Sequence, residues 1–172
     1  MRKSNELMKR AENRYESGVL PPEMAQLPPE LALKRGGCVV IECPERIPCD
    51  PCHTGCPTGA VLPFADINDT PRVDGDKCTG CALCVAKCPG LACFVVDISY
   101  GGEDEALIRL PYEMFPRPLA GSSVDCTDRT GRVVAGGTVE SVREPAKDRT
   151  AVVSVVVPRG LAGEIRGIEV RV

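Results

Sequence analysis

Eleven cysteines carry most of the chemistry available to this 172-residue chain, and ten of them lie between residues 38 and 93. The most regular run reads Cys78-Thr-Gly-Cys81-Ala-Leu-Cys84-Val-Ala-Lys-Cys88-Pro89. Its first three thiolates can bind three corners of one iron–sulfur cubane if the chain curls around it. The small residues between them let backbone N–H groups approach the sulfurs and stabilise their negative charge. We expect Pro89 to turn the chain away, so that Cys88 faces a different centre.

A less regular run lies earlier in the chain and is called the first run here, the Cys78–Cys88 run being the second: Cys43-Pro-Glu-Arg-Ile-Pro-Cys49-Asp-Pro-Cys52-His-Thr-Gly-Cys56-Pro57. Its last three cysteines repeat the spacing of two and then three intervening residues, and its end repeats the Cys-Pro pair. Its first cysteine is displaced, because five residues separate it from Cys49. Internal repetition of this kind is more specific than a lone pair of cysteines. It predicts two related metal centres, each built by a short strand, a loop and a helical turn.

The two runs resemble those of the bacterial ferredoxins that hold two [4Fe–4S] clusters, over roughly residues 37–100. In that family the fourth cysteine of each run ligates the other cluster. The resemblance implies one cluster on Cys43, Cys49, Cys52 and Cys88, and a second cluster on Cys78, Cys81, Cys84 and Cys56.

The displaced cysteine leaves alternatives open. Cys43 need not be a ligand, and a non-crossed arrangement would place Cys43, Cys49, Cys52 and Cys56 on one cluster. A [3Fe–4S] cluster at the irregular site, or a single cluster with a degenerate first run, would also satisfy the spacing. A zinc ribbon needs only two Cys-x2-Cys knuckles around one ion, so eight cysteines exceed its requirement.

Four further residues are assigned other roles. Cys38 and Cys93 occupy apolar positions of the repeat, where a free cysteine behaves as a small buried hydrophobe. Cys126 lies outside the repeat, and we assign it no redox role. His53, the single histidine, could ligate iron, but four thiols are already available there. A solvated or hydrogen-bonding role is therefore expected for it.

We expect an α+β fold with three parts. Residues 1–36 form an N-terminal helix and a proline-rich arm, whose apolar Met24, Leu27, Leu31 and Leu33 would pack along a partner. Residues 37–109 form a ferredoxin-like two-[4Fe–4S] module with a pseudo-twofold β-loop-α repeat. Residues 110–172 contain β-branched runs between glycine-rich turns and predict a small antiparallel β domain.

All-cysteine ligation leaves no open coordination position, so the expected chemistry is one-electron transfer, with no catalytic residue assigned. The pattern from Ile41 to Cys52, together with the second run, resembles small ferredoxin-like subunits of multi-subunit flavin-dependent dehydrogenases that oxidise amines or amino acids. The resemblance implies an electron-transfer subunit in a hetero-oligomer with flavin-containing partners. The alternatives are a free-standing soluble ferredoxin and a zinc-binding structural module. An enzyme with its site in the C-terminal part is less favoured, because residues 110–172 contain no histidine and no nucleophile motif.

Composition excludes other classes of protein. The formal net charge is −3 and basic runs are missing, which disfavours nucleic acid as a partner. No stretch approaches the roughly 20 apolar residues that a membrane helix needs. The polar start of the sequence lacks an apolar secretory core, so we expect a cytoplasmic protein.

Overall fold

The computed structural model describes residues 18–21, 28–145 and 150–171. Its main element is one sheet of seven strands in the order β1-β2-β3-β6-β5-β4-β7, in which every neighbouring pair is antiparallel. The described helices are short, with at most five residues each. The strands are β1 Cys38–Ile41, β2 Cys93–Asp97, β3 Glu105–Tyr112, β4 Ser123–Thr127, β5 Val133–Arg143, β6 Ala151–Pro158 and β7 Gly167–Val170; the helices are α2 Glu30–Leu33, α3 Pro51–Thr54, α4 Leu83–Lys87 and the 3-10 helix η2 Arg159–Leu161.

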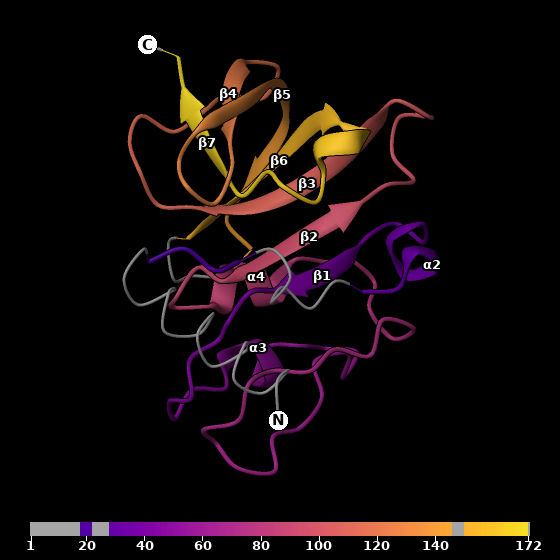
Figure 1. Ribbon diagram of the computed structural model, residues 1–172, viewed down its shortest axis with the longest axis vertical. Coiled ribbons are helices and arrows are strands. Elements are labelled where there is room, and N and C mark those ends of the chain that lie inside the picture. Colours follow the sequence, from indigo (N-terminus) through magenta and orange to yellow (C-terminus); the bar gives the residue numbers. More distant parts are fainter. Residues whose placement is uncertain (1–17, 22–27, 146–149, 172) are drawn as a thin grey trace, which may run out of the picture.

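The predicted fold class is wrong. The described residues form mostly a continuous seven-stranded antiparallel sheet, not a ferredoxin-like α+β module followed by a separate small β domain. The reason lies in β3, which pairs with β2 on one edge and with all eight residues of β6 on the other. Backbone pairing therefore continues from the cysteine-rich part directly into the C-terminal strands. Figure 1 shows β1 and β2 in the middle of the molecule, with β4, β5 and β7 above them and α3 below.

Strands β1 and β2 are buried on both faces. Successive side chains of a strand point to opposite faces of its sheet. Val40 and Phe94 belong to a large core with the C-terminal strands, which extends as far as Ile168 of β7. Val39 and Cys93, on the other face, belong to a second core with residues of the cysteine loops. The two strands therefore separate two cores. The larger one is shared with the C-terminal strands, and the smaller one with the cysteine loops.

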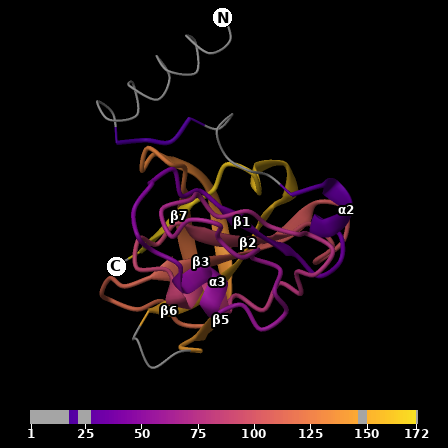
Figure 2. The ribbon, with the colours of Figure 1, turned by 90° about the horizontal axis from the view of Figure 1, so that it is seen from below.

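Helix α3 lies beneath the sheet in Figure 1 and in front of its strands when the molecule is seen from below in Figure 2. It packs against α4 at Gly55, where an added Cβ would lie 3.1 Å from Cγ of Lys87. No helix among the described residues is long and apolar enough to cross a membrane.

The predicted arm contributes to the chain's own core. Leu33 packs against the large core, and its carbonyl accepts a hydrogen bond of 3.2 Å from the Ile98 N–H. Ala32 is also buried. Leu33 thus packs on the chain's own core, and contact of the arm with a partner stays a prediction. Met24 and Leu27 lie outside the described residues, as does the side chain of Leu31.

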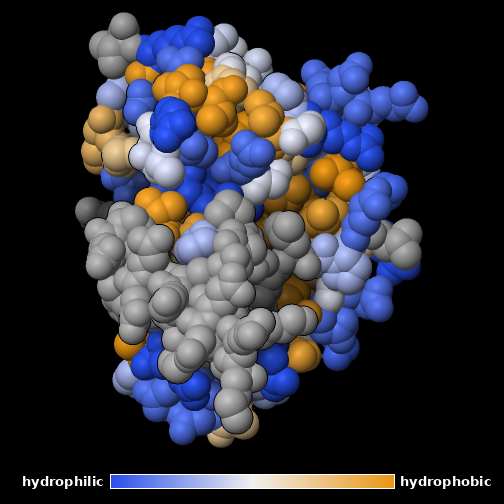
Figure 3. All heavy atoms as spheres, viewed as in Figure 1, coloured by the Kyte–Doolittle hydropathy of each residue, from blue (hydrophilic) through white to orange (hydrophobic). Residues whose placement is uncertain are grey.

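Apolar side chains also reach the surface. Figure 3 shows apolar atoms mixed with hydrophilic ones over the upper part of the molecule, where the C-terminal strands lie. The large hydrophobic residues with the greatest exposure follow β3, namely Met114, Phe115 and Leu119.

Gly137 of β5 is closely packed and yields a stability prediction with a matched control. A Cβ at Gly137 would lie 2.7 Å from Sγ of Cys126 and 2.7 Å from a methyl of Val155. We expect Gly137→Ala to destabilise the protein by about 1–3 kcal/mol, since overpacking forces neighbouring atoms to move. The adjacent Gly136→Ala should be neutral or slightly stabilising, because its Cβ would meet only Nη2 of Arg171 at 3.9 Å. Anaerobic denaturant unfolding measures both; equal effects would contradict this packing.

Candidate functional site

Two pockets divide the eight predicted ligands into two sets of four. The first, named here the Cys78 pocket, is walled by residues that include Val39, Val61 and Val95. The second, the Cys43 pocket, is walled by residues that include Ile41 and Pro51. The Cys78 pocket is lined by Cys56, Cys78, Cys81 and Cys84, and the Cys43 pocket by Cys43, Cys49, Cys52 and Cys88, with Cys93 as a fifth.

This division follows the crossed arrangement. Cys56 is the last cysteine of the first run, yet it lines the pocket of the second run. Cys88 is the last cysteine of the second run, yet it lines the pocket of the first. A non-crossed set would require Cys56 in the Cys43 pocket, whose lining does not include it. Cys43 lies in its expected set in spite of its displacement along the chain. Metal ligation by these thiols stays a prediction.

Short helices carry cysteines toward both pockets. Helix α4 contains Cys84, and the Cys88 N–H donates a hydrogen bond of 3.1 Å to the Cys84 carbonyl directly after it. One helical turn therefore joins a thiol of the Cys78 pocket to a thiol of the Cys43 pocket. Helix α3 repeats this arrangement, with Cys52 inside it and Cys56 just beyond. Pro51 begins α3, where its fixed φ favours the first turn.

The loop before α4 needs a glycine. Gly80 has a φ of +66°, and an added Cβ would lie 2.5 Å from the Gly36 carbonyl oxygen. Only glycine adopts this backbone without strain and also allows so close an approach. Ala82, which precedes α4, has a left-handed conformation as well, with a φ of 63°. These two residues curl the chain so that Cys78, Cys81 and Cys84 face one space.

Hydrogen bonds to sulfur favour the thiolate of one cysteine in each pocket, Cys78 and Cys88. The Val39 N–H donates to Sγ of Cys78 over 3.4 Å, and the Ala92 N–H donates to Sγ of Cys88 over 3.3 Å. A hydrogen bond from the Cys38 thiol is the main reason that the pKa of Cys78 falls to about 6. One from the Cys93 thiol has the same effect on the pKa of Cys88, which also falls to about 6. Both groups are therefore thiolates at neutral pH, the form that binds metal.

Three other cysteines behave differently. Burial raises the pKa of Cys52 to about 12, and it also raises the pKa values of Cys43 and Cys49. These thiols keep their protons at neutral pH unless a cation favours the thiolate. The Cys43 pocket thus combines one ready thiolate, Cys88, with three thiols that a metal centre would have to deprotonate.

The remaining residues that sequence reasoning singled out have other surroundings. Nδ1 of His53 lies 2.8 Å from the Val61 carbonyl, and the ring packs edge-on against Phe64, with centroids 6.1 Å apart. His53 lines neither pocket. Cys38, Cys93 and Cys126 are completely buried. Within the described part of the chain, no three His, Cys, Asp or Glu side chains are grouped closely enough to hold a single metal ion.

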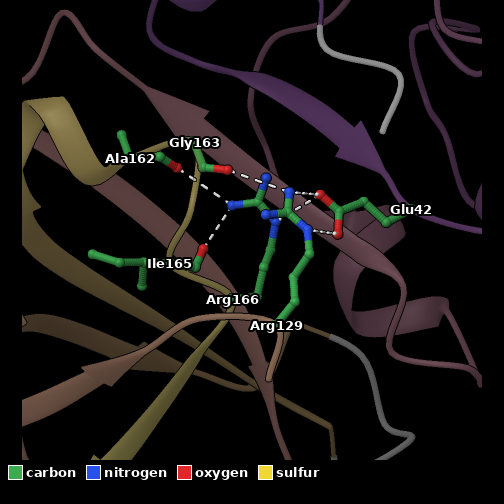
Figure 4. A network of polar contacts seen from close by, with 6 residues as sticks. All are labelled: Glu42, Arg129, Ala162, Gly163, Ile165 and Arg166. Carbon is green, nitrogen blue, oxygen red and sulfur yellow. Dashed lines mark hydrogen bonds and ion pairs between the residues drawn. The ribbon is translucent and has the colours of Figure 1, made fainter. Parts of the chain in front are cut away.

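A buried charge network forms at Glu42, the residue before Cys43, and no sequence pattern predicted it. Glu42 accepts hydrogen bonds from Nε and Nη2 of Arg129, the first of 2.8 Å, and from Nε of Arg166, also of 2.8 Å. The Glu42 side chain is 6% exposed, and those of Arg129 and Arg166 are 10% and 4% exposed. Figure 4 shows both guanidinium groups directed at the one carboxylate. The trio carries one excess positive charge and joins the end of β1 to the C-terminal part of the chain.

The environment of Glu42 keeps this carboxylate ionised. Burial alone would raise its pKa, but the hydrogen bonds from Arg129 and the charge of Arg166 hold the pKa below its ordinary value. Arg166 is fixed in turn by its Nη1, which donates to the Ile165 carbonyl over 2.6 Å, and by the Phe94 ring, whose centroid lies 5.2 Å away.

A further buried cation lies near the Cys78 pocket. Arg109 of β3 is 4.0 Å from Asp97 and close enough to interact electrostatically with Cys81. Its buried Nη1 has no hydrogen-bond partner among the described residues. The Cys78 pocket therefore has a buried positive charge nearby, which would stabilise an anionic group.

Comparison with known proteins finds no relative of this chain. The chain matches no protein-family model, no curated protein and no solved structure.

The network yields a stability prediction. Glu42→Gln should cost about 3–5 kcal/mol of unfolding free energy, because it leaves two buried guanidinium groups without their counter-charge. Asp125→Asn is the matched control, since it removes the carboxylate of the exposed pair with Arg171. The control should leave the unfolding free energy nearly unchanged. Anaerobic denaturant titrations compare the two variants, and a similar small effect for both would refute a structural role for the network.

Proposed function

We propose that this chain is an iron–sulfur protein that holds one [4Fe–4S] cluster in each pocket and transfers single electrons. The observation that carries the proposal is the lining of the two pockets. Each is lined by four of the eight candidate ligands, and the division matches the crossed sets that the resemblance to two-cluster ferredoxins implies.

The chemistry of the donors fits such a group. Four candidate ligand thiols line each pocket, and no three of the described metal-binding side chains meet at one point that would hold a single ion. Thiolates are the ligands of iron–sulfur clusters. The backbone N–H groups of Val39 and Ala92 point at ligand sulfurs, and the unpartnered Nη1 of Arg109 lies near the Cys78 pocket. Such donors and charges stabilise a cluster that is itself an anion.

When bound, the two clusters would supply one-electron oxidation and reduction, and the chain's own residues would control it. Eight cysteines would fill the coordination positions, so substrate would have no access to a metal. Val39, Val61 and Val95 would exclude water from the Cys78 pocket. Ligands of the two centres are separated by one turn at Cys84 and Cys88, and again at Cys52 and Cys56. Two short covalent paths would thus connect the centres.

Each pocket has a lining residue at the surface, where a partner could exchange electrons with the centre. Cys81 is exposed at the Cys78 pocket, and Ile47, 50% exposed, lines the Cys43 pocket. One centre could accept an electron at its own surface while the other donates at a different one. We propose that a flavin-containing dehydrogenase is the donor and that a further acceptor takes the electron. The competing function is a diffusible carrier, and a flavoprotein that co-purifies anaerobically in a fixed ratio from the native source would exclude it.

Two clusters predict about eight iron atoms and eight acid-labile sulfides per chain, without stoichiometric zinc. Anaerobic metal and sulfide analysis measures these contents, and electron paramagnetic resonance of the reduced protein should show two interacting centres. A reproducible content near four irons with one isolated signal would disprove the two-cluster proposal. Stoichiometric zinc without sulfide would favour a structural metal site.

Replacement of the displaced cysteine tests its role as a ligand. Cys43→Ser should remove or damage the centre in the Cys43 pocket, and should leave about four irons on the centre of Cys78, Cys81 and Cys84. Cys126→Ala is the control, because Cys126 is a free cysteine in the large core that lines neither pocket. Full iron content in Cys43→Ser, or equal loss in the control, would contradict the assignment.

A further inference from the structure

We propose that a third cavity, between β7, the start of β2 and the end of β3, is a binding site for a small carboxylic acid with an apolar body. The carboxylate would pair with the buried guanidinium of Arg166, and the apolar part would pack against Phe94, Tyr112 and Met114, which all line this cavity. None of these residues lines a cysteine pocket. The inference therefore goes beyond electron transfer and does not depend on it.

The cavity lies where two strands approach each other without pairing. Strand β7 is the last strand of the sheet, and among the described strands it pairs only with β4. The pairing of β2 with β3 stops at Arg109, so Tyr112 at the end of β3 has a partner only in β6. Residues of β3 and β7 nevertheless line the same cavity. The space between them is therefore not filled by backbone hydrogen bonds.

The size and walls of the cavity suit a small molecule. Its volume is about 330 Å³, which lies within the range of small-molecule sites. Phe94, Tyr112 and Ile168 are buried members of the large core, so the core holds this part of the wall in place. Met114 also lines the cavity and is 62% exposed, so a ligand can enter from solvent. Such sites combine mostly apolar walls with a few polar groups that orient the ligand.

Arg166 is the polar group that an anion would meet. Its Nε donates to Glu42, and its Nη1 donates to the carbonyls of Ala162 and Ile165 (Figure 4). Its Nη2 is buried and has no hydrogen-bond partner among the described residues. Glu169, an exposed acid of the cavity wall, is therefore not a partner of Nη2. A buried donor without an acceptor is costly, so a ligand oxygen that pairs with it would be favoured.

The charge of the network favours a monoanion. Arg129 and Arg166 share the single carboxylate of Glu42, so two positive charges face one negative charge. The three side chains are at most 10% exposed, and water therefore screens the excess charge only weakly. Guanidinium groups match the planar geometry of carboxylates. One excess charge and one free nitrogen suit a monocarboxylate better than a phosphate dianion.

The test uses the full-length protein, purified anaerobically, with phenylacetate as the probe and phenylacetamide as the neutral control of similar shape. Isothermal titration calorimetry measures both affinities. Nuclear magnetic resonance of isotopically labelled methionine methyl groups reports on Met114, whose signal is assigned from the spectrum of Met114→Leu. We expect the acid to bind at least about tenfold more tightly than the amide, because only the acid brings a charge to Arg166. The Met114 signal should shift when the acid binds.

Three variants test the wall and the charge. Met114→Ala should weaken the binding of phenylacetate several-fold, because it removes apolar contact area. Leu119→Ala is the matched control, since Leu119 is also exposed but does not line the cavity, and it should leave the affinity unchanged. Arg166→Lys keeps the charge but loses Nη2, and should reduce the preference for the acid over the amide. The comparison of acid with amide in the wild-type protein needs no variant to fold.

Four results would overturn the inference. Equal affinities for phenylacetate and phenylacetamide in the wild-type protein would exclude recognition of the carboxylate. Absence of binding by either compound at millimolar concentration would exclude a site for this class of ligand. Binding that leaves the Met114 signal unshifted, or that Met114→Ala and Leu119→Ala weaken equally, would place the acid elsewhere on the protein.

Discussion

The burial of β1 and β2 on both faces is the constraint on which the rest of the structure depends. A short strand pair with alternating side chains supplies Val39 to one core and Val40 to the other. The cysteine loops need the first face as the wall of their pockets. The C-terminal strands need the second face to complete a core that reaches from Val40 to Ile168. A segment of about 60 residues buries too little surface to be stable alone, so a shared strand pair benefits both parts.

The charge of the thiolates is the second constraint on the structure. Grouping eight thiols in two pockets is costly when several of them are buried thiolates, because burial disfavours the charged form. The chain offsets this with backbone donors at Val39 and Ala92 and with the buried cation Arg109. The network of Glu42, Arg129 and Arg166 ties the residue before Cys43 to residues near the C-terminus.

The contrast between site and fold shows what local spacing can predict. The spacing of Cys78, Cys81 and Cys84 predicted that these three face a common space, and they line one pocket. The exchange of Cys56 and Cys88 between the pockets came from the resemblance to two-cluster ferredoxins and could not be read from spacing. The strand character of residues 151–157 was also recognisable from the β-branched run. Its pairing was not, because Leu107 and Val156 meet across 49 residues and no local pattern encodes that contact. For the same reason Glu42 and Arg166, separated by 124 residues, could not be paired in advance. Cys38 and Cys93 were expected to be buried, but their contacts with ligand sulfurs depend on the β1–β2 register.

The most direct test of the central claim is a crystal structure of the anaerobically purified protein, with anomalous diffraction measured on both sides of the iron absorption edge. The account predicts two separate iron sites, one in each pocket. Cys56 should ligate the centre of Cys78, Cys81 and Cys84, and Cys88 should ligate the centre of Cys43, Cys49 and Cys52. A single iron site, a signal at the zinc edge alone, or Cys56 and Cys43 on the same centre would contradict it.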